Sequence, residues 1–363
     1  MAEYYVASAR STCPTPAQGC FVEFEDVLVD SCGGSLLVPE ISSPTTFPFL
    51  HRFAAPYRIN VPKPRTGAEQ VLIIVCVNGS FLYELLASMP GWRSRFDLVC
   101  AFISDAWLPK IELDKPKWKL RLTRQHRTCS SIDHVFIPLT GSIGEIQEYY
   151  GVPVSFLPLA CDVLKFGSNQ SHRPIDLNAY GRQDQKHRKM LEEFYNAPTS
   201  SRMFYHTNHM MIGKVYDLYA HRRIFWKILQ WSRITFAYDA LRANEYGRFR
   251  ISFVGQRWFE GITAGCLIVG HKPTCPEMNE LFSWEDATVE VPEDENELIP
   301  WLEGLLADKE RLGAAHLRNY SHALARHDWR HRVATMHDCL KLPYPEQLEK
   351  QLTLIERKSR KLA

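Results

Sequence analysis

Continuous apolar runs alternate with amphipathic segments along most of the chain. Residues 71–77 (VLIIVCV) form an unbroken apolar run rich in β-branched side chains, and Asn78-Gly79 ends it. Such runs are typical of strands that are buried on both faces of a parallel sheet. A helix over 81–89 follows, then strands over 97–103, 133–138 and 154–158, with a helix over 142–150 before the last of these. Strands that alternate with helices at this spacing predict βαβ units.

A second series of the same kind begins after the polar stretch 167–172. It predicts strands over 175–180, 202–205, 234–238 and 266–270, and helices over 187–195, over 215–231 and from about 256. Apolar residues recur at helical spacing from Leu298 to Leu306, and helices continue from there to the end. We therefore expect an α/β protein with two Rossmann-like domains that face each other across a cleft, and with C-terminal helices.

The length of 363 residues fits two domains. We expect an N-terminal domain over 1–160, with an irregular connection over 38–69, and a C-terminal domain over 161–342. The last helix, 343–363, either packs back on the N-terminal domain or forms a solvated amphipathic tail. In an open parallel sheet, ligands bind beyond the carboxyl ends of the strands, so candidate chemistry belongs in the turns that follow strands.

Composition narrows the class of partner. The 43 Lys and Arg residues nearly balance the 41 Asp and Glu residues, which leaves a net charge of +2. A dedicated nucleic-acid coat would carry a large field of one sign, so we expect no nucleic-acid partner and a small, locally held anion. No transmembrane segment and no secretion signal are evident, which predicts a cytoplasmic protein. The ten cysteines form no C-x-x-C pair and indicate reduced core thiols, with a Cys13–Cys20 disulfide as the alternative.

A turn with the outline of an anion site follows the strand 175–180. Gly181 and Arg182 make the turn, and Lys186, His187 and Arg188 begin the next helix. Backbone amides at a helix N-terminus, with cationic side chains above them, suit a phosphate. A turn glycine flanked by solvated basic residues is the alternative interpretation.

The most specific segment is 255–270, GQRWFEGITAGCLIVG. An Arg-x-Phe-Glu-x-x-x-Ala-Gly helix that leads into a Leu-Ile-Val strand, with Pro273 three residues past its end, resembles the donor-binding segment of GT-B glycosyltransferases. The group most similar is the glycosyltransferase-like family named for spore-maturation proteins (glycosyl transferases group 1). Residues 158–162 (PLACD) resemble the stretch that links the domains of these enzymes, and 327–330 (HDWR) resemble their closing helix. The resemblance covers about 155–340.

The resemblance implies a transferase that moves a sugar from a nucleotide-diphosphate donor to an unidentified acceptor. In the family, the glutamate of this helix accepts hydrogen bonds from the nucleotide ribose, which implies that role for Glu260, since a carboxylate suits a vicinal diol. The helix N-terminus at Gly255 would face the diphosphate, and Arg257 would add a bidentate charge. Gly265 would permit close approach of helix to strand.

One position departs from the family. Related retaining enzymes carry a second glutamate eight residues before the first, where this chain has Ser252. Retention and inversion therefore both stay open, and Glu245 is the nearest upstream carboxylate, a candidate catalytic residue. The chain contains no Asp-x-Asp pair, so we expect a metal-independent reaction with no metal site and no cofactor beyond the nucleotide-sugar co-substrate.

The remaining candidates also follow strands. Asp105 comes after the strand 97–103 and is a candidate base for an acceptor hydroxyl, with Trp107 placed to stack on a sugar ring. A helix-capping aspartate beside a packing tryptophan is the alternative. Lys214, after the strand 202–205, is a candidate phosphate contact.

Two other functions fit the same two-domain shape. A non-catalytic sugar-nucleotide or assembly protein would keep a GT-B shell, and Ser252 in place of the glutamate favours it. A sugar-nucleotide epimerase would instead use acidic and histidine side chains from both halves of the chain.

Overall fold

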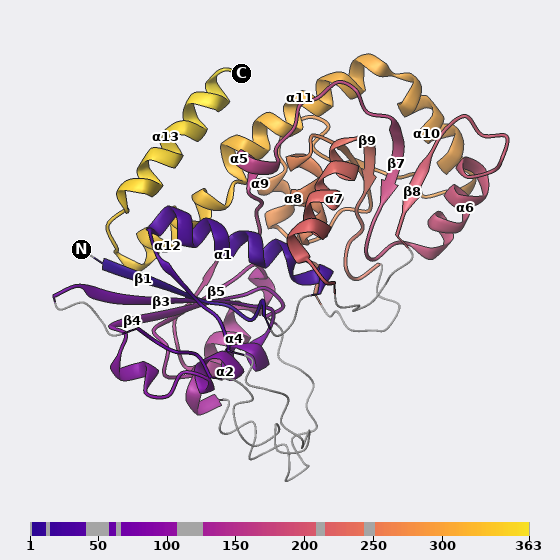
Figure 1. Ribbon diagram of the computed structural model, residues 1–363. Coiled ribbons are helices and arrows are strands. Elements are labelled where there is room, and N and C mark those ends of the chain that lie inside the picture. Colours follow the sequence, from indigo (N-terminus) through magenta and orange to yellow (C-terminus); the bar gives the residue numbers. More distant parts are fainter. Residues whose placement is uncertain are drawn as a thin grey trace, which may run out of the picture. The chain divides into compact units, whose positions relative to one another are not determined.

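The computed structural model describes residues 2–11, 15–40, 58–62, 67–106, 126–207, 215–242 and 251–362 (Figure 1). The chain divides into two compact units. The first consists of Met1–Pro158 with Arg332–Gln351, and the second of Leu159–His331 with Leu352–Ala363. Each unit holds a parallel sheet flanked by helices, which confirms the prediction of an α/β protein.

The first unit contains a six-stranded sheet of order β2-β1-β3-β4-β5-β6. Within this unit, α1 lies on one face of the sheet, and α2 and α4 lie on the other (Figure 1). Its strands are β1 (Ala2–Ala7), β2 (Ser35–Leu37), β3 (Glu69–Cys76), β4 (Leu98–Ile103), β5 (His134–Ile137) and β6 (Val154–Phe156). Its helices are η1 (Pro16–Gln18), α1 (Gly19–Cys32), α2 (Gly79–Ala87), η3 (Trp92–Ser94), η4 (Thr140–Ser142) and α4 (Ile143–Tyr150).

Local chemistry explains where these elements begin and end. Every residue of β3 after Glu69 is buried, as its unbroken apolar run predicts. The Asn78 side chain caps α2 by accepting hydrogen bonds from the backbone N–H groups of Ser80 and Phe81. Gly151 closes α4 in the left-handed region at φ 68°, where glycine carries no steric penalty. The chain therefore turns sharply after β3 and α4, as the sequence predicts.

The C-terminal helices α12 (Trp329–Leu340) and α13 (Glu346–Arg360) supply residues to the first unit. His337 on α12 forms a hydrogen bond of 3.1 Å with the Tyr4 hydroxyl of β1. Ser31 on α1 donates to the Gln351 amide oxygen on α13 over 2.6 Å. Side chains more than 300 residues apart thus stabilise one core.

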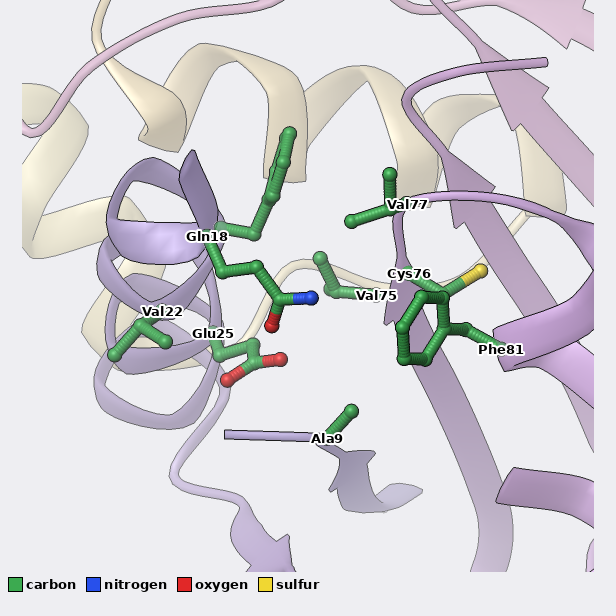
Figure 2. Close-up of a pocket in the computed structure, with 9 residues that line it drawn as sticks. Ala9, Gln18, Val22, Glu25, Val75, Cys76, Val77 and Phe81 are labelled. Carbon is green, nitrogen blue, oxygen red and sulfur yellow. The ribbon is translucent and has the colours of Figure 1, made fainter. Parts of the chain in front are cut away.

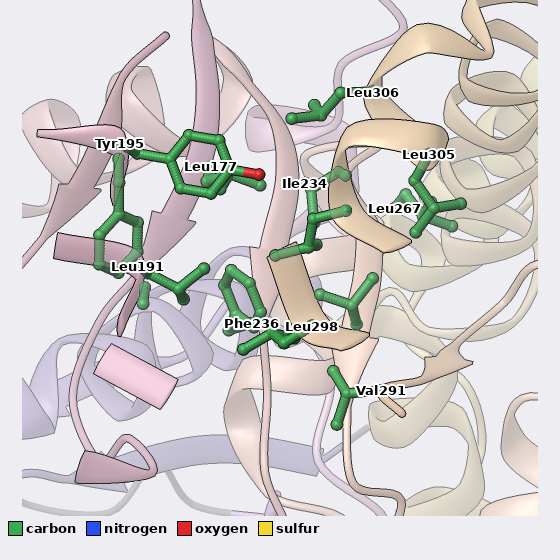
Figure 3. Close-up of a cluster of buried hydrophobic side chains, with 14 of the residues drawn as sticks. Leu177, Leu191, Tyr195, Ile234, Phe236, Leu267, Val291, Leu298, Leu305 and Leu306 are labelled. Atoms are coloured by element: carbon green, nitrogen blue, oxygen red, sulfur yellow. The ribbon is translucent and has the colours of Figure 1, made fainter. Parts of the chain in front are cut away.

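The second unit contains a five-stranded sheet of order β11-β10-β9-β7-β8. Leu177, Ile234, Phe236 and Leu267 from the strands pack against Leu298 and other residues of α10 to form its core (Figure 3). Its strands are β7 (Ile175–Ala179), β8 (Phe204–His206), β9 (Ser232–Phe236), β10 (Leu267–Gly270) and β11 (Val289–Glu290). Its helices are α5 (Val163–Phe166), α6 (Gln185–Tyr195), α7 (Leu218–Gln230), α8 (Gln256–Thr263), α9 (Glu277–Leu281), η5 (Glu295–Glu297), α10 (Leu298–Ala307) and α11 (Lys309–Arg326).

Two of the segments that carried the family resemblance meet in this unit. Cys161 and Asp328 form a parallel bridge, and the Asp328 carboxylate accepts from the Leu164 N–H over 3.0 Å. The Arg330 guanidinium lies 2.8 Å from the Asp162 carboxylate and 3.0 Å from that of Asp328. Because all of these polar groups are buried, pairing them with one another avoids the large cost of an isolated charge.

Two further predictions concern membranes and thiols. In the part of the chain that the structure describes, no helix is long and apolar enough to cross a membrane. The described cysteines are free thiols, and all but Cys339 are buried. Cys20 is among them, and Cys13 lies outside the described residues.

Candidate functional site

The carboxyl edge of the second sheet gathers the turns after β7, β8, β9 and β10. The Gly181 N–H, after β7, donates to the Thr207 hydroxyl, after β8, over 3.3 Å. The Asp239 N–H, after β9, donates to the His271 carbonyl, after β10, over 2.9 Å. These bonds fix neighbouring turns to each other, so that the edge presents polar groups from several strands together.

Gly181 adopts a left-handed conformation at φ 65° and lies against Arg257 of α8. A Cβ at this position would come within 3.2 Å of the Arg257 Nε, so the turn needs glycine for conformation and for space. The guanidinium donates to the Arg182 carbonyl, and burial lowers the pKa of Arg257. Arg257 thus packs against the Gly181–Arg182 turn and stabilises it through this hydrogen bond.

Both carboxylate oxygens of Glu260, on α8, accept hydrogen bonds from other side chains. Its Oε1 accepts from the Arg222 guanidinium of α7 over 2.8 Å, and its Oε2 accepts from the Tyr180 hydroxyl over 3.1 Å. Glu260 is only 4% exposed, and burial followed by the nearby Glu260 charge raises the pKa of Tyr180 well above its usual value. Both oxygens of this carboxylate are therefore engaged by side chains of the same unit.

A histidine pair lies at the same edge, and sequence analysis named His187 of this pair but not His271. His187 of α6 forms a 3.2 Å hydrogen bond with the Tyr238 hydroxyl, and its ring centroid lies 5.8 Å from that of His271. Burial, with Arg242 and His187 nearby, lowers the pKa of His271 to about 4, so its ring is neutral at pH 7. The His271 Nε2 is buried and has no partner among the described residues. A buried imidazole nitrogen of this kind is a candidate ligand contact.

The sequence contained a weak indication that His271 belongs to the site. It directly follows Gly270, the last residue of a predicted strand, and that is the place where ligand-contacting residues of open sheets lie. Nothing in the local pattern separates it from the other thirteen histidines, because its ring partners come from α6 and from the turn after β9.

Ser252, at the position where related enzymes carry a glutamate, lies beside a carboxylate from another loop. Its hydroxyl donates to the Asp239 Oδ2 over 2.9 Å and accepts from the Thr274 N–H over 2.8 Å. Asp239 is 6% exposed and also accepts from the Leu241 N–H. A carboxylate therefore does occur next to this position, although it comes from a different strand.

The candidate glycines Gly255 and Gly265 lie at the two ends of α8. Gly255 is the N-cap residue, and no side chain from the described residues caps the helix there. Gly265 follows the helix at φ 71°, where a Cβ would lie 2.4 Å from the Ser168 carbonyl and 3.1 Å from that of His316. Close approach of backbone thus explains Gly265, with a loop and α11 as the neighbours in place of the expected strand.

The remaining candidates divide between described and undescribed residues. Asp105 follows β4, is half-buried, and donates its N–H to the Val77 carbonyl over 2.7 Å, so it lies at the carboxyl edge of the first sheet. Lys214, Glu245 and Trp107 lie outside the described residues. Among the residues that are described, no three His, Cys, Asp or Glu side chains group so as to hold a metal ion.

A comparison with protein families shows which proteins this part of the chain resembles. The profile of a family described as glycosyl transferase-like matches residues 176–338, which run from β7 into α12. Residues 176–338 are therefore similar to glycosyl transferase-like proteins, and the matched part includes Gly181, Arg257 and Glu260. No curated protein sequence matches the chain.

Three solved structures align with the chain. HepE (Alr3699) of Anabaena, in complex with UDP-glucose, aligns with a TM-score of 0.52 at 9% identity, over 94% of this chain and 100% of that one. The pneumococcal O-GlcNAc transferase GtfA, in complex with UDP and GlcNAc, aligns at 0.36 and 12% identity, over 79% of this chain and 56% of that one. TarM aligns at 0.44 and 7% identity, over 74% and 54%. The chain thus spans about half the length of GtfA and of TarM, and its likeness to HepE confirms the GT-B fold.

Proposed function

We propose that the chain is a metal-independent glycosyltransferase that moves a sugar from a nucleotide-diphosphate donor to an acceptor not yet identified. The match over 176–338 carries this proposal, because it includes α8 and the turns at the carboxyl edge of the second sheet. UDP-glucose is the first donor to test, since HepE was solved with it. The Arg-x-Phe-Glu motif supports placing the chain near the spore-maturation-protein-like group.

The donor would bind at that edge. The uncapped amides at the α8 N-terminus and the Gly181–Arg182 turn would face the diphosphate, where preorganised N–H groups offset the charge of the leaving group. Glu260 would hold the ribose once Tyr180 yields its place, and Arg222 would keep the carboxylate ionised and oriented. Lys214 and Glu245 stay predictions of the sequence.

The binding-protein alternative rests on Ser252. The Asp239 carboxylate accepts a hydrogen bond from the Ser252 hydroxyl. An acidic side chain therefore lies next to the position of the missing glutamate. That observation favours an enzyme over a binder. We also propose a cytoplasmic location, which the free thiols among the described residues support.

A thermal-shift panel tests the proposal. UDP, GDP, dTDP, CDP and their sugars are each added to the full chain. A ligand at about 100 times its Kd stabilises the folded state by roughly 2.7 kcal/mol, so one nucleotide should raise the Tm clearly. Glu260→Gln should abolish that rise, and Glu310→Gln, an exposed change on α11, should keep it. No response to any nucleotide would sink the proposal.

A further inference from the structure

A pocket of the first unit is too small for any ligand larger than water. It lies between Glu25 of α1 and the end of β3 at Val75 and Cys76 (Figure 2), and its volume is about 10 Å³. That volume holds one water-sized group. The surface of the second unit offers a larger feature, the outer face of α7.

The outer face consists of five exposed residues on α7 and at its C-cap. Tyr219, Arg223, Lys227 and Trp231 follow one another at intervals of four residues, and Ile224 adjoins this row. Residues four apart lie one above the other on a helix, so the five side chains share one side of it. Ile224 is 63% exposed, Tyr219 is 42% exposed and Trp231 is 39% exposed.

The inner face of α7 has apolar residues of its own. Trp226 and Leu229 are buried, and the Trp226 ring stacks on Phe166 with the ring centroids 4.8 Å apart. Arg222 pairs with the buried Glu260 over 2.8 Å. The inner face therefore fixes the helix in its unit, and the apolar residues of the outer face are not needed for the core. Exposed apolar residues that gather in one place mark interaction sites, whereas single ones are ordinary.

The outer face is basic as well as apolar. Arg223 and Lys227 are exposed, and the Lys227 Nζ lies 5.1 Å from the centre of the Trp231 ring. No residue of α7 is acidic, and Asp217, just before the helix, is the N-cap residue that accepts from the Ala220 N–H over 2.9 Å. The outer face is therefore complementary to a partner that carries negative charge beside apolar groups.

An anionic membrane surface has both properties. Trp and Tyr rings favour the interface between lipid and water, and an isoleucine side chain is buried at the boundary between headgroups and acyl chains. Lys and Arg keep their charges among the headgroups while their stems lie along apolar surface. Anionic lipids are enriched in the cytoplasmic leaflet, which agrees with the location proposed above.

The size and the charge of the outer face argue against two other partners. A stable protein interface uses about 20–30 residues on each side, whereas the outer face has five. Strong binding to a nucleic acid rests on many phosphate contacts, on the order of 6–10, whereas the outer face supplies two basic side chains. A membrane needs only a few anchors, because its surface is planar and extended.

We propose that the outer face of α7 holds the protein on an anionic membrane surface. Ile224 and the two aromatic rings enter the headgroup region, and Arg223 and Lys227 pair with lipid phosphates. Because α7 is fixed in its unit, the second unit lies on the membrane and does not cross it. The contact is reversible, since one short helix face supplies it.

The test measures sedimentation of the full chain with lipid vesicles in the absence of nucleotide. We expect binding to phosphatidylcholine vesicles with about 30 mol% phosphatidylglycerol, and binding at least about fivefold weaker to phosphatidylcholine alone. Ile224→Glu should weaken binding to the anionic vesicles about tenfold or more. Leu354→Glu, the same kind of change at an exposed leucine of α13, should keep binding within about twofold.

The basic residues have variants of their own. Arg223→Gln/Lys227→Gln should weaken binding about 10- to 30-fold, since each basic side chain near an anionic surface adds to the affinity. Arg357→Gln/Lys358→Gln removes the same charges from exposed positions of α13 and should keep binding. Added salt should release the unmodified chain. If the α13 variant loses binding and the α7 variant keeps it, the basic end of α13 is the membrane contact and the inference is overturned.

Equal binding by Ile224→Glu and the unmodified chain overturns the inference, as does the absence of binding to anionic vesicles. A dimer in light scattering that Ile224→Glu dissociates also overturns it, because a second copy then covers the face. If Ile224→Glu fails to fold by circular dichroism, the charge variant carries the test, since both of its side chains are exposed. A chain that binds vesicles through α7 but binds no nucleotide supports this inference, while the proposed function fails.

Discussion

The contacts of Glu260 explain both what the sequence predicts at single residues and what it misses. The residue stands out because its motif is continuous along α8. Its partners do not, since Arg222 lies 38 positions earlier on α7 and Tyr180 lies 80 positions earlier after β7. Only folding brings them together, so local spacing carries no trace of this buried pair.

Arg222→Met should therefore destabilise the protein by about 3–5 kcal/mol, because it leaves the Glu260 charge buried without its partner. Urea denaturation measures the loss. The double variant Arg222→Met/Glu260→Gln should recover a large part of it, since the uncompensated charge is then gone. A loss below 1 kcal/mol in the single variant would show that water reaches the carboxylate.

Glu25 should give the stability of the protein a specific pH dependence. The folded-state pKa of about 7 exceeds the ordinary value of 4.5, so the folded protein holds this proton more tightly than the unfolded chain does. The unfolding free energy of the unmodified chain, relative to that of Glu25→Gln, should fall by on the order of 3 kcal/mol as pH rises from 4.5 to 7. Denaturation curves at several pH values measure it, and a constant difference between the two proteins would contradict the burial argument.

At the scale of elements, the apolar pattern predicts the strands well and misjudges some of their ends. The predicted strand 234–238 is β9 (Ser232–Phe236), and the residues beyond it, Ala237 and Tyr238, are still buried at the site edge. Apolar runs report burial, whereas strand ends depend on pairing. Sequence analysis assigned no elements before the irregular connection over 38–69, where the structure has β1, α1 and β2.

Replacing Gly270, the last residue of β10, should strongly destabilise the protein. Its φ is 153°, and a Cβ there would lie 1.7 Å from the Ala237 carbonyl, so Gly270→Ala forces β9 and β10 apart. We expect loss of several kcal/mol or failure to fold.

Gly304→Ala is the matched control. Gly304 lies inside α10 with open space around its Cα, so alanine should stabilise the protein by about 0.5–1 kcal/mol. Urea denaturation compares the two. If Gly270→Ala is as stable as the unmodified chain, the close approach of the two strands is wrong.

At the scale of the molecule, two series of alternating elements predict two α/β halves, and the structure has two parallel sheets. The same periodicity predicts the last helices without saying which unit they join. That choice depends on contacts such as Ser31 with Gln351, which are 320 positions apart. A near-neutral chain with local basic turns remains consistent with a small anionic donor.

The central claim is tested most directly by cleavage of the nucleotide sugar that the thermal-shift panel selects, with UDP-glucose tested first. The rate is measured in the presence and in the absence of EDTA. The account predicts release of the nucleoside diphosphate at the same rate in both, with the activity lost in Glu260→Gln. Binding without any release would contradict the transferase, and release that EDTA abolishes would contradict a metal-independent reaction.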